Sequence, residues 1–159
     1  MPEHIHLAVE ACFQKAEAFF KTSFPRPEVS FKLRGQKAGV AHITENKLRF
    51  NPVLYAQNRD DFLQQTVPHE VAHLVAYKQF GLKIAPHGQE WQLIMRGIYG
   101  LEPKRCHDYA ITPRASKQYQ YVCKCPTANE FALSARRHGL ILKGRGYICK
   151  RCKAVLVAA

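Results

Sequence analysis

The stretch Val67–His73 constrains this chain more than any other. It reads Val-Pro-His-Glu-Val-Ala-His, which is H-E-x-x-H inside an apolar run compatible with a helix. Positions i and i+4 of a helix share one face, so His69 and His73 can direct their imidazoles at one point. Two neutral imidazoles at this spacing suit Zn²⁺, and Glu70 beside them suits the base that activates a metal-bound water. The motif therefore predicts a helix that carries a zinc site.

A catalytic zinc needs a third protein ligand, which must come from further along the chain. The metzincin class would place Gly and His seven and ten residues after the first histidine of the motif. This chain has Ala76 and Gln79 there, so that class is excluded. Two candidates remain, His87 and Glu90, which lie 14 and 17 residues beyond the second histidine. From the residues alone, either a His₂Glu site or a His₃ site with a nearby carboxylate is open.

Apolar periodicity around the motif predicts an α+β domain. The expected elements are helices at residues 3–21, 60–80 and 91–98, and short strands at residues 29–33, 40–44 and 48–50. Trp91 and Met95 fall on the apolar stripe of the last helix, and we assign them to the core. Pro68 lies inside the second helix, where it removes a backbone donor. It therefore predicts a kink or restart just before the first histidine of the motif.

The pattern changes after Pro113 to short β-like segments separated by turns. They are expected at residues 119–122, 131–135, 141–142, 147–148 and 154–157. We accordingly place a first domain at residues 1–112 and a second at residues 113–159.

Four of the six cysteines form two close pairs in this second domain. They are Cys123 and Cys125, and, after 23 intervening residues, Cys149 and Cys152. Such pairs on either side of a hairpin-like segment are typical of a zinc ribbon with a structural Cys₄ site. A redox role for the C-x-x-C pair would call for a βαβ context, which is missing here. His138 is a substitute ligand, Cys12 is expected to be a buried thiol, and Cys106 receives no role.

The two histidine-bearing elements together resemble a known family. Thr66-Val-Pro-His-Glu-Val-Ala-His-Leu-Val, followed by Ala85-Pro-His-Gly-Gln-Glu-Trp, is similar to the SprT family, whose relatives include the eukaryotic Spartan protease. The likeness extends to the N-terminal helix, Asn51-Pro52 and the cysteine tail. It implies a small zincin-like metalloprotease domain with a C-terminal β zinc ribbon. It also implies that His87, in its Pro-His-Gly context, is the third zinc ligand.

Metal chemistry then suggests a mechanism of peptide hydrolysis. Zinc bound by three imidazoles lowers the pKa of its water towards ~7. Glu70 is expected to accept the water proton and to deliver it to the departing amine. A second donor to the oxyanion could be Tyr77, His107 or Tyr109. The resemblance to Spartan-type enzymes implies substrates that are bound or crosslinked to DNA, with DNA as an activator.

Charge supports a polyanionic partner for the second domain. The formal net charge is +12, and residues 101–159 carry 12 basic against 3 acidic side chains. Basic residues beside aromatic ones suit phosphates and unstacked bases of DNA, including its single-stranded form. The candidate contacts are Lys124, Arg136, Arg137, Lys143, Arg145, Lys150, Arg151 and Lys153. Tyr119, Tyr121 and Tyr147 lie among them and are assigned mainly to the small core.

Two other interpretations compete with a DNA-stimulated zinc endopeptidase. One is a non-enzymatic, zinc-dependent nucleic-acid-binding protein with a structural or vestigial H-E-x-x-H site, although such a site has no need of Glu70. The other, a transcription-type zinc-ribbon factor, leaves residues 60–98 unexplained. We expect zinc to be the only cofactor. The N-terminal residues resemble no secretory signal and no apolar run approaches the ~20 residues of a membrane span, so a cytoplasmic protein is expected.

Overall fold

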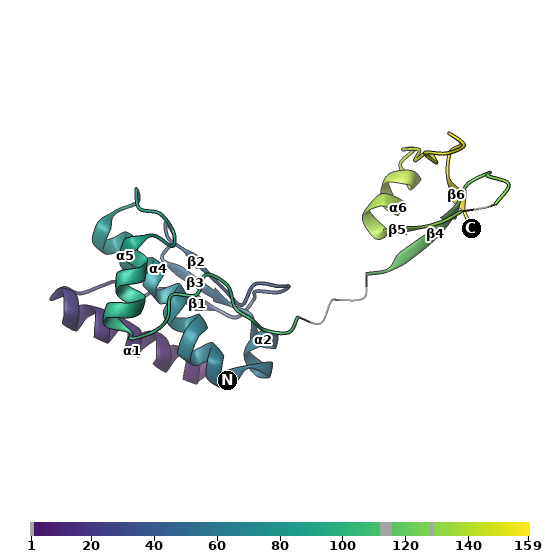
Figure 1. The fold of residues 1–159 in the computed structure, drawn as a ribbon. Coiled ribbons are helices and arrows are strands. Elements are labelled where there is room, and N and C mark those ends of the chain that lie inside the picture. The colour runs from purple at the N-terminus through teal and green to yellow at the C-terminus, as the bar shows by residue number, and fades with distance from the viewer. Residues whose placement is uncertain (1, 112–115, 128) are drawn as a thin grey trace. The chain divides into compact units, whose positions relative to one another are not determined.

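The computed structural model describes residues 2–111, 116–127 and 129–159. The chain forms two compact units, Met1–Ile111 and Thr112–Ala159, and each has a hydrophobic core of its own (Figure 1). The mixed content of helices and short strands confirms the α+β class. The domain boundary expected between residues 112 and 113 lies outside the described residues and stays a prediction.

The first unit surrounds a three-stranded sheet with helices. Its elements are α1 (Pro2–Phe20), β1 (Glu28–Ser30), β2 (Gly39–His42), β3 (Lys47–Phe50), α2 (Pro52–Gln57), α3 (Arg59–Asp61), the π-helical segment η1 (Phe62–Thr66), α4 (Val67–Phe80), α5 (Gln89–Leu93) and the π-helical segment η2 (Ile94–Ile98). All three predicted helices and all three predicted strands are present, with shifted ends. The short helix α2 was not expected from the sequence.

The sheet has the strand order β1-β3-β2, which leaves β2 at an edge. β2 and β3 form an antiparallel hairpin whose turn includes Asn46 at a positive φ of 48°. β1 pairs with β3 in parallel, so this sheet is mixed. Along β3, Leu48 and Phe50 are fully buried and Lys47 and Arg49 are half-buried, as the two-residue period of a strand requires.

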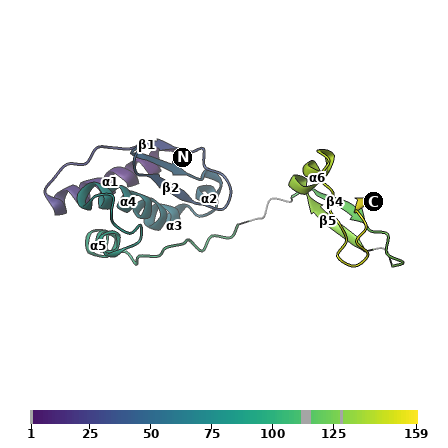
Figure 2. The ribbon, with the colours of Figure 1, turned by 90° about the horizontal axis from the view of Figure 1, so that it is seen from above.

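Helix α4 is the central element of the first unit. It packs against α1 on one side and against β2 on another (Figure 2). The apolar stripe of α1, which includes Ile5, Val9, Phe13 and Ala16, is buried in the same core. Most of α4 is therefore removed from water, including the polar side chains of Glu70 and His73. A helix in this position gives its polar groups little freedom to move.

The restart expected at Pro68 takes the form of a change in helix type. In η1, the N–H of Val67 bonds to the carbonyl of Phe62, five residues back, and the backbone stays helical at Thr66 (φ −67°, ψ −46°). α4 then begins at Val67, so Pro68 follows directly on the π-helical turn, and its missing N–H falls where the hydrogen bonding changes from π- to α-helical. The proline is thus accommodated without breaking the helix.

The second unit is a small sheet with one helix. It contains β4 (Gln118–Val122), β5 (Glu130–Ser134), α6 (Ala135–Leu142) and β6 (Val157–Ala158), and the antiparallel strand order is β5-β4-β6. Its core comprises five buried residues: Tyr121, Cys123, Leu133, Cys149 and Leu156. In the described part of the chain, every helix is too short or too polar to cross a membrane.

Three strand predictions in the second unit were wrong in detail. Residues 141–142 end helix α6, because the hydroxyl of Ser134 accepts a hydrogen bond from the N–H of Arg137 and caps a helix there. Residues 147–148 contribute only a single bridge, from Ile148 to Val155. The last strand begins at Val157 instead of residue 154.

Asn51 joins the sheet to the helices. Its side-chain oxygen accepts hydrogen bonds from the N–H groups of Val53 (3.0 Å) and Leu54 (3.3 Å), which caps α2. Its amide nitrogen donates to the carbonyls of Gly35 (3.0 Å) and Lys37 (3.2 Å), in the segment before β2. With only 1% of its surface exposed, Asn51 fixes the entry to the edge strand beside α4.

Replacing Asn51 with alanine should destabilise the first unit strongly. Four hydrogen bonds are lost at a buried position, so we expect a fall of about 3 kcal/mol in the free energy of unfolding. Urea titration followed by the fluorescence of Trp91 measures this, because the chain has one tryptophan and it lies in this unit. Asn58→Ala is the matched control, since Asn58 donates a single side-chain bond, to Leu54. Equal losses in the two variants would contradict the role given to Asn51.

Candidate metal centres and cleft

Helix α4 and the loop before α5 bring three histidines together. His69 and His73 are one helical turn apart on α4, and His87 approaches from the loop. The Nε2 atom of His69 lies 3.2 Å from Nε2 of His73 and 3.3 Å from Nε2 of His87. The ligand atoms of all three lie within 4.8 Å of one another, so they could hold one metal ion. Glu90 is not part of this group among the described residues.

Trp91 forms the apolar support of the three histidines. It is 1% exposed, and its ring is stacked on His73 with an interplanar angle of 21°. The same ring meets His69 and His87 edge-on, each at 4.8 Å between centroids. Its Nε1–H also donates to the backbone carbonyl of His69 (3.3 Å). Trp91 was assigned to the core from the sequence, and the structure adds contact with every imidazole of the group.

The protonation of the imidazoles fits a metal ion. Burial lowers the pKa of His69 to about 4 and that of His73 to about 3, and burial also lowers the pKa of His87. All three are therefore neutral near pH 7. The Nδ1–H of His69 donates to the carbonyl of Lys104 (3.1 Å), which leaves its Nε2 with a free lone pair. Neutral imidazoles with converging Nε2 atoms are the donor set that zinc prefers.

Glu70 lies beside the histidines but faces the edge strand β2. Glu70 is 7% exposed, and burial raises the pKa of its carboxyl to about 8. A hydrogen bond from the Ala41 backbone and the charge of Lys37 act in the opposite direction and lower this pKa in part. β2 approaches so closely that a Cβ atom on Gly39 would lie 2.6 Å from Cγ of Glu70. Only glycine fits there. The carboxyl group is thus held between α4 and β2.

The histidines and Glu70 line a cleft of about 570 Å³. The lining includes the segment from Gln36 to Ala41 and residues 104–109. The cleft also contains all three side chains considered as oxyanion donors: Tyr77, His107 and Tyr109. The site is therefore open to a substrate on the side of the edge strand.

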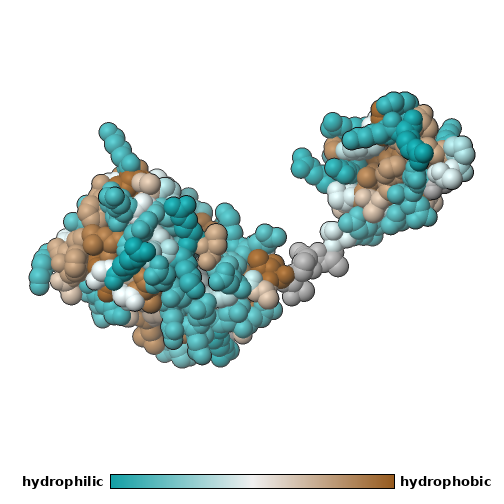
Figure 3. Space-filling model, in the orientation of Figure 1, coloured by the Kyte–Doolittle hydropathy of each residue, from teal (hydrophilic) through white to brown (hydrophobic). Residues whose placement is uncertain are grey.

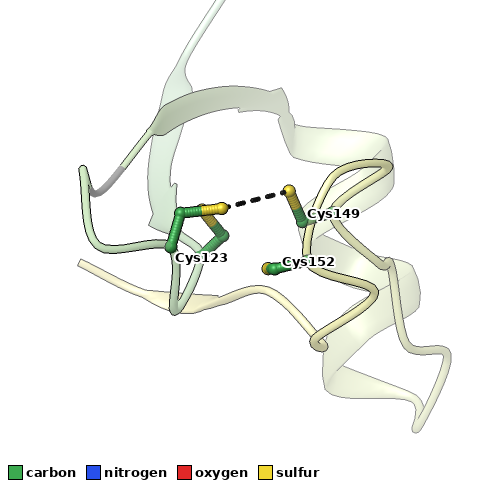
Figure 4. A group of neighbouring side chains, drawn as sticks. Cys123, Cys149 and Cys152 are labelled. Atoms are coloured by element: carbon green, nitrogen blue, oxygen red, sulfur yellow. Dashed lines mark hydrogen bonds between the residues drawn. The ribbon is translucent and has the colours of Figure 1, made fainter.

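The four cysteines of the second unit form the other candidate metal centre. Their sulfur atoms lie within 4.8 Å of one another, and the side chains point towards a common centre (Figure 4). Backbone N–H groups of Cys125 and Asn129 lower the pKa of Cys123 to about 6, and the backbone of Ala154 lowers that of Cys152. Hydrogen bonds from the Cys125 thiol to the sulfur atoms of Cys123 and Cys152 favour its protonated form and raise the pKa of Cys125. Such a group fits zinc.

The remaining residues singled out in the sequence are not members of either group of candidate ligands. His138 stacks on Tyr119 at 3.7 Å and its Nδ1 lies 2.8 Å from the hydroxyl of Tyr121, so it supports the sheet, apart from the cysteines. Cys12 is buried in the first core and Cys106 is exposed. All eight basic candidates are exposed, and hydrophilic side chains cover much of the visible face of this unit (Figure 3). None of the eight forms an ion pair within the described residues.

Two contributors to the cleft were missed from the sequence. The carbonyl of Lys104 acts through the main chain, and no sequence pattern reports the direction of a backbone carbonyl in a loop. Gly39 carries a signal that could have been used. A glycine inside a short strand often marks the close approach of another group, which here is Glu70.

The fold and the two ligand groups define an α+β protein with a zinc-ribbon unit and a separate group of three histidines. The SprT-like family model matches residues 9–107, and the SprT-like zinc ribbon domain matches residues 117–159. The chain therefore belongs to the SprT-like family.

Curated relatives agree with this assignment over nearly the whole chain. Protein SprT of Pseudomonas aeruginosa (strain UCBPP-PA14) is 65% identical over 157 residues, which is 99% of this chain and 95% of that protein. Proteins of the same name from Pseudomonas putida (strain KT2440) and Pseudomonas syringae pv. syringae (strain B728a) are 62% and 60% identical, with the same coverage. No solved structure matches the chain significantly.

Zinc content should respond separately to the two groups. We expect about two equivalents of zinc in the intact chain and about one in either His87→Ala or Cys149→Ser, because each variant removes a ligand from one group. Elemental analysis of the purified proteins measures this, and Cys106→Ser is the control that should keep both ions. Loss of both ions from a single variant would show that the groups are not independent.

Proposed function

We propose that this chain is a zinc-dependent endopeptidase in which His69, His73 and His87 hold the catalytic ion. The observation that supports it best is the position of Glu70. A carboxyl group is buried next to three converging imidazoles, at the wall of an open cleft. A purely structural metal site would not need an ionisable group in so unfavourable a place.

When bound, zinc would polarise both a water molecule and a peptide carbonyl. The residues of the chain supply the rest. Glu70 takes up the proton of the attacking water and returns it to the nitrogen of the departing amine. Its contact with the Ala41 backbone and with β2 keeps the carboxyl group in one orientation. Trp91 excludes water from the other side of the imidazoles.

The edge strand β2 supports a peptide as the substrate. The N–H of Asn51 bonds to the carbonyl of Ala38, so residues 38, 40 and 42 are the ones directed at β3 in this register. The backbone N–H and C=O groups of Gly39 and Ala41 therefore face the cleft. An extended peptide could form strand-like hydrogen bonds with those of these groups that are not bonded to Glu70. A substrate aligned in this way would pass Glu70 and the histidines.

Glu70→Gln tests the catalytic role directly. The amide keeps the shape of the side chain but accepts no proton, so we expect proteolysis to fall at least ~100-fold while zinc content is unchanged. The measurement is cleavage of an unstructured protein substrate such as casein, with and without single-stranded DNA. Glu45→Gln changes an exposed carboxyl group outside the cleft and should keep full activity. Full activity in Glu70→Gln would refute the assignment of the base.

We propose further that the ribbon binds nucleic acid, so that the protease acts on DNA-associated or DNA-crosslinked proteins. The support is the exposure of eight basic side chains that lack acidic partners within the described residues. The choice of DNA-bound proteins as substrates follows the resemblance to Spartan-type enzymes. The non-enzymatic alternative, a nucleic-acid-binding protein with a vestigial histidine site, gives no reason for the buried Glu70.

Removing basic residues from the ribbon should lower the salt dependence of DNA binding. For the triple change Lys143→Gln, Arg145→Gln and Lys150→Gln, we expect weaker binding and a slope of log K against log salt that is smaller by about 2. Fluorescence anisotropy of a labelled single-stranded oligonucleotide at several salt concentrations measures both. The control is an equal loss of charge in the first unit, by substituting Gln for Lys15, Lys21 and Lys78. Equal effects of the two triple changes would contradict a specific role of the ribbon.

A further inference from the structure

Residues 102–111 form a strap along one wall of the cleft. The strap contains no helix or strand, yet four hydrogen bonds hold it to other parts of the first unit. One runs from Arg96 to Glu102, and the other three are made by strap residues that line the cleft. The carbonyl of Lys104 accepts from Nδ1 of His69 (3.1 Å). Nε2 of His107 bonds to the carbonyl of Gln36 (2.9 Å), and the hydroxyl of Tyr109 bonds to that of Thr66 (2.8 Å). An irregular segment with this many fixed points is well suited to place a backbone group accurately.

The attachment points belong to the machinery around the metal ligands. Thr66 is the last residue of η1 and lies three residues before His69. Gln36 lies in the segment that leads into β2, the strand against Glu70. The ring of Tyr109 is also stacked on Phe62 of η1, at 6.1 Å with an interplanar angle of 11°. The strap is thus fastened to α4 through His69, to η1 through Thr66, and to the segment that precedes β2 through Gln36.

His107 serves the strap itself. A carbonyl can only accept a hydrogen bond, so Nε2 of His107 must donate to Gln36. Its Nδ1 then accepts from the backbone N–H of Tyr109 (3.3 Å), and the two rings stack at 4.6 Å. Both ring nitrogens are used, and the hydroxyl of Tyr109 is used by Thr66. His107 is therefore not free, in this arrangement, to serve as a second oxyanion donor.

We propose that the strap is a positioning element for the metal site, in which Tyr109 and His107 hold the carbonyl of Lys104 against the ring of His69. This rests on the proposed metal site at the three histidines. The carbonyl fixes both the orientation of the ring and its tautomer, so that Nε2 keeps the lone pair that binds the metal. Such outer partners of a ligating histidine commonly contribute 10–100-fold to metal affinity.

Tyr109→Phe in the full chain tests the proposal. It removes the bond to Thr66 and keeps the stacking on Phe62, so the strap should loosen and zinc affinity at the histidines should fall about 10-fold. Affinity is measured by competition with a chromogenic chelator. The zinc-binding step that is lost in His87→Ala is the one that belongs to the histidine site. Co²⁺ in place of zinc gives a second measurement, because loosened coordination shifts its visible absorption bands.

Two further variants separate positioning from general destabilisation. Thr66→Val removes the partner hydroxyl, so it should cause the same loss of affinity as Tyr109→Phe, and the double variant should lose no more than either. Tyr99→Phe is the matched control: its hydroxyl is also buried but has no partner in the described structure, and zinc affinity should be unchanged. Thermal unfolding followed by Trp91 fluorescence establishes that each variant is folded.

The outcomes distinguish this proposal from the proposed function. Wild-type zinc affinity and an unshifted cobalt spectrum in Tyr109→Phe would overturn the role of the strap while leaving the metal site intact. Additive losses in the double variant, or an equal loss in Tyr99→Phe, would also overturn it. If His87→Ala binds zinc as the wild type does, the histidine site itself is refuted, and the strap proposal with it.

Discussion

The packing of α4 between α1 and β2 is the constraint on which the first unit depends. A helix buried on several sides can carry polar side chains only where each has a partner. Glu70 finds one in the backbone of β2, and His69 finds one in the carbonyl of Lys104. The Nε2 atom of His69 is left facing Nε2 of His73 at 3.2 Å and Nε2 of His87 at 3.3 Å. Three nitrogen atoms arranged in this way could bind a single metal ion.

The two groups of candidate metal ligands contribute to different degrees to the folding of the units that carry them. The first unit has an extensive hydrophobic core that includes Phe13, Phe50 and Phe62 and contains none of the three histidines. In the second, two of the five buried core residues are themselves cysteines of the Cys₄ group. The ribbon therefore has little apolar surface to stabilise it without its ligands engaged, and metal binding there is largely folding energy. In the first unit, an ion at the three histidines would complete a site that the fold has already formed.

Parts of the site that depend on residues close together in the sequence could be predicted, and parts that depend on distant residues could not. The spacing of His69 and His73 is a local property of a helix, and the sequence alone was enough to pair them. Residue chemistry could not choose between His87 and Glu90, because the loop after α4 could present either. The choice of His87 came from the resemblance, and the structure groups that residue with the other two. Local capping at Ser134 outweighed a strand-like pattern, which explains the missed helix α6.

Gly39 shows how a long-range requirement can leave a trace in the sequence. A carboxyl group beside a metal must be close enough to act, yet burial raises its pKa and opposes the ionised form. The backbone of Ala41 and the charge of Lys37 offset part of this, but only if β2 lies directly against the side chain. Any residue larger than glycine at position 39 would push the strand away, since its Cβ would fall 2.6 Å from Cγ of Glu70. The absence of a side chain at Gly39 is therefore part of what places Glu70, although this residue contributes no functional group of its own.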